Sequence, residues 1–420
     1  MKVLVIGSGG REHAICTALA VSARVTGLYC APGNGGIALV ANCVPVAATD
    51  VSGVVDFAKN NAIDYVVVAP DDPLALGMVD ALEEAGIRAF GPRKSAAIIE
   101  SSKIFSKDLM KKYGIPTAKY AVFTDLGAAE DYIASQKAPI VVKADGLALG
   151  KGVVVAQSTE EALRAAREMM GGGKFGAAGA RIVVEECMTG PEVTVLAFAD
   201  GKIVVPMLSS QDHKRAFDGD NGPNTGGMGA FCPSPNYTAA LAVRCEREIF
   251  RPTLEAMSAE GRPFSGVLYF GLMLTPDGPR VIEYNARFGD PETQPILSML
   301  DTDILDIFEA VTDGRLGELE IKWKSGAACC VVMASGGYPE RYGKGFEISG
   351  LDNVPEDITV FHAGTKAENG KYYTNGGRVL GVTAHGADLP SAIARAYAGV
   401  AQISFENAHF RTDIGKGLVK

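Results

Sequence analysis

The sequence has no apolar run long enough to cross a bilayer and no cysteine spacing typical of a metal site. A membrane-spanning helix needs about 20 consecutive apolar residues. The opening MKVLVIGSGG has one lysine and a very short apolar run, unlike a secretory signal peptide. The eight cysteines form no CxxC pair, and several lie in apolar runs such as GAACCVVMAS, where buried free thiols are usual. We therefore expect a reduced, cytoplasmic protein without disulfides or zinc.

Repeats, low-complexity linkers and an excess of basic residues are also missing. The 420 residues carry a net charge of −9, which disfavours binding to nucleic acid. Hydrophobic residues make up 47% of the chain and charged residues 21%, as in ordinary globular proteins, which argues against extensive disorder. A chain of this length forms two to four domains more often than one.

The first hundred residues alternate short apolar strands with helical segments, which predicts a small doubly wound α/β domain. The predicted strands are KVLVIG, VTGLYCA, DYVVVAP and IRAFGP. The predicted helices are REHAICTALA, VVDFAKNN and PLALGMVDALEEAG, the last opened by Asp72 and Pro73.

A different pattern begins near Ser101. SSKIFSKDLMKKYGIP predicts a helix that ends at Gly114 and Pro116, and APIVVKADG and KGVVVAQS predict two strands around a glycine-rich turn. RIVVEECMTGPEVTVLAFADG predicts two more strands, and FSGVLYFGLML with PRVIEYNARFG predicts a hairpin. The last hundred residues open with the apolar run GAACCVVMASGG and close with the helix LPSAIARAYAGVAQI. The chain as a whole is predicted to be a multidomain α/β and α+β protein.

Two glycine-rich turns could bind phosphate. GSGGREH follows the first strand, but the third glycine of a dinucleotide fingerprint would fall at Glu12, and no acidic residue ends the second strand. A glycine turn that opens a helix still offers amides to an anion, although a purely structural turn remains the alternative. In VVKADGLALGKGVVV, Lys143 and a loop with Gly146, Gly150, Lys151 and Gly152 could cover phosphates; the alternative is a solvent-exposed hairpin.

Two predicted strands end in acidic residues that could bind a metal ion or another ligand. Glu283 and Asn285 in VIEYNARFG lie two residues apart, so they share a strand face and offer hard oxygen ligands suited to Mg²⁺. Arg287 continues this face and places a cation beside the metal. Glu185 and Glu186 in VVEEC could bind a ligand or could be an outward acid pair that caps a strand.

The order of Lys103, KADGLALGKGV, VVEEC and VIEYNARFGDPETQP resembles the ATP-grasp ligases. Within them the chain is most similar to the phosphoribosylamine–glycine ligase family, through GSGGREHA, APGNGG, SSQDHKRAFDGDNGPNTGGMGAF, FHAGT and TNGGRVL. These matches span nearly the whole chain. Ser8 stands where the family pattern has Asn, and Asp71 in APDDPL stands where it has Glu.

The resemblance implies three domains: an amino-terminal substrate-binding α/β domain (1–102), a central ATP-grasp domain (103–315) with a small lid (about 117–190), and a carboxy-terminal α+β domain (320–420). It implies an ATP-dependent ligase that joins glycine to 5-phosphoribosylamine through a glycyl phosphate in purine biosynthesis. It further implies ATP and Mg²⁺ or Mn²⁺ as cofactors, and we expect a monomer or weak homodimer with small-molecule partners, no nucleic acid and no membrane.

The resemblance also implies a role for each matched residue. Arg287, Asp212 and Lys214 would be catalytic, and Glu283 and Asn285 would hold the metal. The ATP-binding set is Lys103, Lys143, Gly150, Lys151, Gly152, Glu185, Glu186, Cys187 and Glu192, with Glu185 and the Cys187 backbone at the adenine and Glu192 at the ribose. The second substrate would contact Gly9, Gly10, Arg11, Asn34 and Asp290.

The segment from Ser209 to Phe231 combines charges of both signs with Gly226, Gly227 and Gly229. By its residues alone, a solvated surface loop with charges of both signs is favoured over a site. The resemblance favours a site in which Asp212 holds the glycine ammonium and Lys214 with the glycine amides faces anions. The remaining alternatives are another ATP-grasp carboxylate–amine ligase and a nucleotide-binding regulatory module without turnover.

Overall fold

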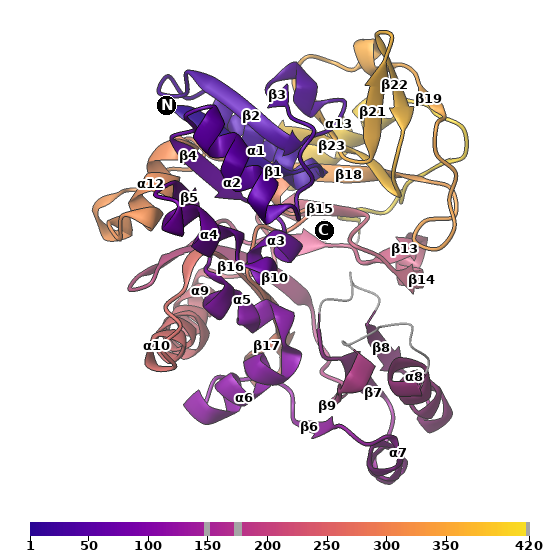
Figure 1. The fold of residues 1–420 in the computed structure, drawn as a ribbon. Helices are drawn as coiled ribbons and strands as arrows, with labels where there is room; N and C mark the ends of the chain where they lie inside the picture. The colour runs from indigo at the N-terminus through magenta and orange to yellow at the C-terminus, as the bar shows by residue number, and fades with distance from the viewer. Residues whose placement is uncertain (147–151, 172–178, 417–420) are drawn as a thin grey trace.

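The structure is a computed structural model and describes residues 1–146, 152–171 and 179–416. Its four larger sheets are an amino-terminal parallel sheet, a central antiparallel sheet, a lid sheet and a carboxy-terminal sheet (Figure 1). The predicted three-domain fold class is confirmed. Within the described residues, no helix is both long and apolar enough to cross a membrane. All eight cysteines are free thiols.

The amino-terminal domain is a five-stranded parallel sheet in the order β3-β2-β1-β4-β5. Leu4 and Ile6 of β1 pack into one core, and Val3 and Val5 pack into another on the opposite face, so the sheet is buried on both sides. The predicted doubly wound domain is therefore confirmed. Its strands and helices are β1 (Lys2–Gly7), α1 (Gly10–Ala20), β2 (Gly27–Pro32), β3 (Asn42–Cys43), α2 (Val51–Asn60), β4 (Tyr65–Val68), α3 (Asp71–Leu76), α4 (Met78–Glu84), β5 (Arg88–Phe90) and α5 (Lys94–Ser101).

One predicted helix of this domain is two helices. The segment predicted as continuous through PLALGMVDALEEAG breaks at Gly77, which has φ of +91° and separates α3 from α4. The left-handed conformation cannot continue an α-helix, and glycine adopts it without steric cost.

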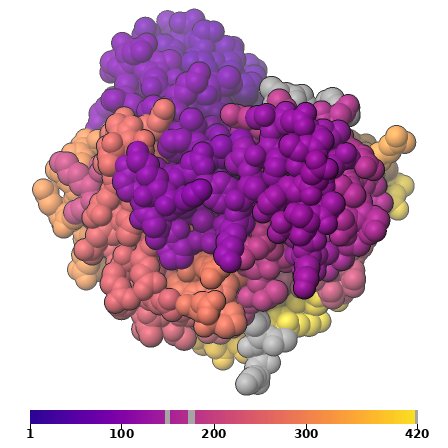
Figure 2. All heavy atoms as spheres, turned by 90° about the horizontal axis from the view of Figure 1, so that it is seen from below, coloured from indigo at the N-terminus to yellow at the C-terminus, as the bar shows by residue number. Residues whose placement is uncertain are grey.

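The central domain contains the antiparallel sheet β11-β10-β16-β17. Helix α6 (Lys103–Tyr113) begins after Ser102, whose side chain accepts from the Phe105 amide, and it ends at Gly114 as predicted. Helices α6 and α10 lie side by side (Figure 1), and Lys112 Nζ contacts Glu260 Oε1, just after α10, at 2.6 Å. In the space-filling view, purple atoms from the region around residue 100 border salmon atoms from the region around residue 250 (Figure 2). The other elements are β10 (Glu192–Asp200), β11 (Val204–Pro206), α9 (Ala239–Cys245), α10 (Arg251–Ala259), β16 (Ser265–Thr275), β17 (Gly278–Asn285), α11 (Thr293–Ser298) and α12 (Ile304–Thr312).

The lid is the antiparallel sheet β6-β9-β7-β8 with helices α7 and α8 packed in one small core. The two strands predicted around the glycine-rich turn are β7 and β8, and they pair with each other. The two strands predicted in RIVVEEC and EVTVLAF lie in different sheets, since β9 is in the lid and β10 is central. The lid elements are β6 (Tyr120–Phe123), α7 (Leu126–Ser135), β7 (Ile140–Ala144), β8 (Val153–Ala156), α8 (Thr159–Gly171) and β9 (Ile182–Glu186).

The carboxy-terminal sheet has the order β12-β15-β18-β23-β20 and is covered by α13. Strands β12 and β15 come from the segment Ser209–Phe231, with β15 ending one residue later at Cys232. In sequence this segment lies between central strands, yet it pairs with the carboxy-terminal sheet. The elements are β12 (Gln211–Asp212), β13 (Arg215–Phe217), β14 (Asn221–Asn224), β15 (Gly229–Cys232), β18 (Ala327–Ser335), β20 (Ile358–His362), β23 (Arg378–Gly386), α13 (Leu389–Val400) and β24 (Ala408–His409).

Candidate active site

Strand β17 and the loop that follows it contact every domain. Lys143 of the lid donates to the Ile282 carbonyl at 3.2 Å. Arg11 of the amino-terminal domain donates to the Phe288 carbonyl at 3.0 Å. Arg378 of the carboxy-terminal sheet contacts the Asp290 carboxylate at 3.2 Å. A site built on this segment can therefore combine residues from the whole chain.

Glu283 and Asn285 lie on one face of β17, as predicted. The strand bulges between its pairings with Gly271 and Leu272, before Glu283, and the spacing of two is kept beyond the bulge. Burial raises the pKa of Glu283, but Lys214, Lys143, Lys103 and Arg287 lower it more, so the net shift is downward. Glu283 thus remains a carboxylate, which is the form that binds a hard cation.

Arg287 lies just beyond the end of β17 and still reaches its polar face. Its Nη2 is 3.4 Å from Asn285 Oδ1 and 3.2 Å from Glu100 Oε1. Its buried Nε has no partner among the described residues. The guanidinium is therefore held at one end by Glu100 and keeps an unused donor.

Lys103 and Lys143, predicted to meet phosphate, converge near β17. Lys143 Nζ lies 3.0 Å from Glu185 Oε2, and Lys103 Nζ donates to the Gly146 carbonyl at 2.8 Å. Burial lowers the pKa of Lys103. Gly152 precedes β8, whereas Gly150 and Lys151 lie outside the described residues.

The two acids at the end of β9 have different environments. Glu185 is buried, and its Oε1 has no hydrogen-bond partner within the described part of the chain. Glu186 is half-buried, accepts from the Lys119 amide at 3.0 Å and contacts Arg280 at 3.1 Å. The alternative of an outward acid pair is therefore wrong for Glu185. Cys187 follows β9 and is partly exposed.

The charges of Ser209–Phe231 divide between two faces. Lys214 Nζ lies 3.3 Å from Glu192 Oε2 and 3.9 Å from Glu283 Oε1, which places it at the β17 edge. Asp218 and Asp220 instead bond to the carboxy-terminal segment, through Thr412 and the buried Arg411. One part of the segment thus faces the β17 edge, whereas residues 217–222 are exposed and lie beside the carboxy-terminal segment.

Asp212 lies at the same edge, next to Lys214 in a partly buried cluster of carboxyl groups. Burial raises its pKa to about 7, although the Lys214 ammonium opposes the shift. Glu292, Glu192 and Glu283 add to the increase. Burial lowers the pKa of Lys214, but Glu192 and Asp212 raise it more, so that it stays charged. An incoming cation would therefore meet several carboxyl groups and one fixed ammonium.

The turn at the start of α1 differs from the expectation of free amides. The Gly9 amide donates to Glu12 Oε2 at 2.5 Å, so the helix N-terminus already faces a carboxylate. Arg11 Nε pairs with the other Glu12 oxygen at 2.5 Å. A Cβ atom at Gly10 would lie 2.6 Å from Gln294 Nε2, so a larger residue here would force the Gln294 side chain to shift.

Asn34 is fully engaged by neighbouring backbone. Its Nδ2 donates to the carbonyls of Ser8 and His362, both at 2.8 Å, and its Oδ1 accepts from the amides of Gly36 and Ile37 at 2.9 Å. These bonds use both amide hydrogens, so Asn34 holds two loops together and its side chain offers no free donor to a substrate.

Asp290 connects this turn to the glycine segment. Arg378 Nη1 donates to the carbonyls of Asp290 at 2.6 Å and Gly226 at 2.7 Å. Burial raises the pKa of Asp290, but Arg378 and Arg11 lower it more, so the carboxyl is ionised. The Asp290 carboxylate also lies close to the turn before α1, because a Cβ atom added at Gly9 would be 3.3 Å from Asp290 Oδ2.

A metal at β17 would need ligands from outside the protein. Among residues 1–146, 152–171 and 179–416, no group of three or more His, Cys, Asp or Glu side chains could hold a metal ion. Glu283 and Asn285 supply two oxygen donors, which fits Mg²⁺ held partly by phosphate and water.

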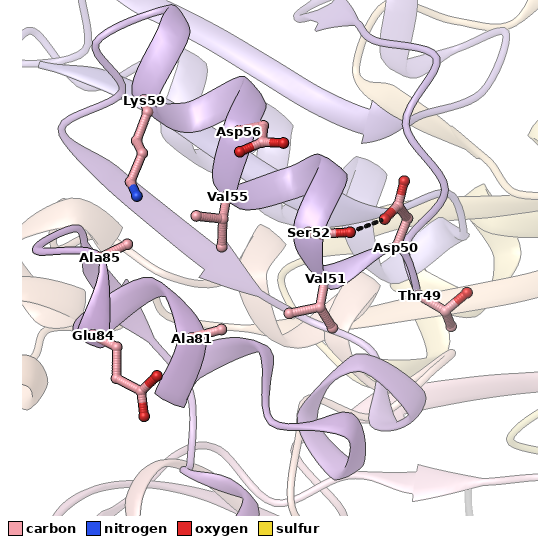
Figure 3. A pocket seen from close by; sticks show the side chains of 10 residues that line it. All are labelled: Thr49, Asp50, Val51, Ser52, Val55, Asp56, Lys59, Ala81, Glu84 and Ala85. Carbon is pink, nitrogen blue, oxygen red and sulfur yellow. Dashed lines mark hydrogen bonds between the residues drawn. The ribbon is translucent and has the colours of Figure 1, made fainter.

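A separate hollow lies on the amino-terminal domain between α2 and α4 (Figure 3). Its volume is about 700 Å³, and the only hydrogen bond drawn in it joins Ser52 Oγ to Asp50 Oδ1 at 3.1 Å. None of the predicted site residues lines it, so it is not part of the candidate active site.

Sequence reasoning gave no role to several buried or partly buried polar residues of this region. They come from segments far apart in the chain, and only their positions in charged motifs could have drawn attention to them. Lys107 follows Lys103 by four residues, and Glu292 lies within the GDPETQ motif. The set is Glu100, Lys107, Tyr269, Glu292 and Arg378.

The lid and the central sheet bring lysines against the edge of β17 that carries a carboxylate and a side-chain amide. This arrangement defines an ATP-grasp enzyme. Three family models match: Phosphoribosylglycinamide synthetase, N domain, over residues 1–100; its ATP-grasp (A) domain over 101–293; and its C domain over 328–417. The chain belongs to the phosphoribosylglycinamide synthetase family, as its sequence predicted.

Relatives cover the whole chain. It is 49% identical to a phosphoribosylamine–glycine ligase of Halalkalibacterium halodurans, covering 100% of this chain and 97% of the relative. It is 50% identical to that of Allochromatium vinosum, covering 99% and 98%. The crystal structure of the Thermotoga maritima phosphoribosylamine–glycine ligase matches with a TM-score of 0.86 and 33% identity, covering 99% and 100%. The biotin carboxylase of Campylobacter jejuni matches with a TM-score of 0.76 at 13% identity, covering 97% and 93%, which reflects the fold alone.

Proposed function

We propose that this chain is the phosphoribosylamine–glycine ligase of purine biosynthesis, which forms glycinamide ribonucleotide, ADP and phosphate. Full-length relatives at about half identity support this activity. The observation that carries the assignment of the site is the contact between Lys214 of the Ser209–Phe231 segment and Glu283 at 3.9 Å. It joins the segment most characteristic of this enzyme family to the β17 edge that we assign to MgATP.

The chemistry requires two displacements. A glycine carboxylate oxygen attacks the γ-phosphorus of ATP, the bond to the bridging oxygen breaks, and ADP leaves. The amine nitrogen of phosphoribosylamine then attacks the carbonyl carbon of glycyl phosphate, loses a proton and expels phosphate. Both steps develop negative charge on phosphoryl oxygens, so catalysis depends on positioning and on nearby cations.

We assign the nucleotide to the space between the lid and β17. Lys103 and Lys143 would contact its phosphates, with Gly150, Lys151 and Gly152 covering them. Glu185 offers a buried acceptor without a partner among the described residues, which suits the amino group of adenine. Glu186 and the Cys187 backbone would complete the adenine edge, and Glu192 would bind the ribose.

Glu283 and Asn285 would hold Mg²⁺ or Mn²⁺, which neutralises phosphate charge when bound. Arg287 would place its unused donor near the transferring phosphoryl group. Asp212 would hold the glycine ammonium, and Lys214 would face the carboxylate. Gly9, Gly10, Arg11 and Asp290 would border the phosphoribosylamine, while Asn34 would position the loops around it.

A coupled ADP-release assay with glycine and freshly prepared phosphoribosylamine tests the function. Release should require both substrates and a divalent cation. Equal turnover with bicarbonate or formate in place of glycine would instead favour another ATP-grasp carboxylate–amine ligase.

We also propose that the protein is a cytoplasmic monomer or weak homodimer that binds small molecules only. Light scattering after size-exclusion chromatography at several concentrations tests the oligomeric state. A stable tetramer at micromolar concentration would contradict the proposal.

A further inference from the structure

One carboxylate oxygen binds two lysines at the junction of the lid and the central domain. Glu185 Oε2 lies 3.0 Å from Lys143 Nζ and 3.1 Å from Lys107 Nζ. The three side chains are at most 5% exposed. Their formal charges sum to +1, in surroundings where an unbalanced charge acts strongly because water screens it little.

Lys107 is held in place by a second contact. Its Nζ donates to Thr117 Oγ1 at 2.8 Å, and the Thr117 hydroxyl donates to the Val281 carbonyl of β17 at 2.7 Å. Lys143 of β7 donates to the carbonyl of Ile282, the residue that follows Val281 in β17. Helix α6 therefore delivers Lys107 to the same Glu185 oxygen that Lys143 contacts.

We propose that Lys107 is a positioning residue that neutralises Glu185, so that Lys143 keeps an uncompensated positive charge for the nucleotide phosphates. Without Lys107, the Glu185–Lys143 pair would be neutral and would attract phosphate less. Lys107 contacts only the Oε2 atom of Glu185, so the Oε1 atom is left to accept a hydrogen bond from the nucleotide. This inference rests on the proposed nucleotide site.

The charge of Lys107 is sensitive to its surroundings. Burial lowers its pKa to about 8, and Glu185 opposes this shift while Lys143 adds to it. Glu283 also raises the pKa. As the pH rises through 8, Lys107 in the free protein should lose its proton, and Glu185 should then neutralise Lys143.

Titration calorimetry with MgADP and with adenosine tests the inference. In Lys107→Met, the Kd for MgADP should rise about tenfold, the scale expected for one unit charge acting through a partly buried site. The Kd for adenosine should change less than about twofold, because adenosine has no phosphate. Lys112→Met is the matched control, since Lys112 lies on the same helix but binds Glu260 at the surface; it should leave both constants unchanged.

A second variant separates charge from packing. Lys107→Met with Glu185→Gln removes one charge of each sign and restores a net charge of +1 on Lys143. Because Glu185 is assigned to the adenine, which both ligands carry, the readout is the ratio of the adenosine Kd to the MgADP Kd, and this ratio should return to its wild-type value. The wild-type Kd for MgADP should rise above about pH 8, and the rise should be smaller in Lys107→Met. If Lys107→Met does not fold, two other measurements test the role of Lys107. The first is the pH profile of the wild-type Kd for MgADP. The second is the Kd for MgADP in Thr117→Val, which removes the second contact of Lys107 without changing any charge.

The outcomes distinguish the two proposals. If the wild-type protein binds no MgADP, the nucleotide site and this inference both fall. If the wild type binds MgADP but Lys107→Met binds it equally well, or loses MgADP and adenosine to the same extent, the function stands and the role of Lys107 is refuted.

Discussion

Replacing Asp212 by asparagine tests whether this carboxylate holds the glycine ammonium. Burial raises its pKa to about 7 in the free protein. With that value, roughly 9% of the molecules have an ionised Asp212 at pH 6 and roughly 91% at pH 8. Because only the carboxylate attracts an ammonium strongly, kcat/KM for glycine should rise about tenfold from pH 6 to pH 8.

The ADP-release assay supplies the measurement, with ATP and phosphoribosylamine held saturating at each pH. Asp212→Asn should have a lower kcat/KM for glycine at pH 8, and its profile should lack the tenfold rise. Asp218→Asn is the matched control, because Asp218 lies in the same segment but binds Thr412. A flat wild-type profile, or the same rise in Asp212→Asn, would refute the reasoning.

Stability gives an independent check on the same group. Its pKa is raised above the ordinary value of 3.8, so the folded state holds more protons than the unfolded state between about pH 4 and pH 7. The contribution of Asp212 to stability therefore falls as the pH rises through this window. Asp212→Asn should melt at a higher temperature than the wild type at pH 8, with a smaller difference at pH 5.

Substitutions at three further positions, one of them combined with Glu100→Gln, test the remaining assignments. Glu283→Gln should raise the Mg²⁺ concentration needed for half-maximal turnover at least tenfold with little change in melting temperature; an unchanged metal dependence would remove Glu283 from the metal site. Arg287→Ala should lower kcat by about two to three orders of magnitude, and Glu100→Gln in that background, which removes the unpaired buried carboxylate, should recover stability without recovering kcat. Near-normal kcat at saturating substrates would make Arg287 structural. Arg411→Met should raise KM for glycine several-fold more than KM for ATP, because Arg411 binds Asp220 at 2.7 Å and braces the hairpin beside Lys214; equal changes in both constants would indicate general destabilisation.

Local patterns in the sequence determined much of the architecture. Alternating strands and helices predicted the doubly wound amino-terminal domain, and the spacing of two between Glu283 and Asn285 predicted their common face. Such patterns suffice because backbone geometry fixes which neighbouring residues share a face. The long motifs identified the family for a different reason, since their resemblance needs no structure.

Tertiary structure decided which polar groups are buried and what they meet. The Gly9 amide, expected to be free for an anion, faces Glu12, and the charges of the Ser209–Phe231 segment separate between β17 and Arg411. The shared carboxylate of Glu185 joins residues from α6, β7 and β9, which no spacing along the chain relates. Burial and charge pairing depend on contacts between distant segments, so the raised pKa of Asp212 and the net charge around Lys143 exist only in the folded chain.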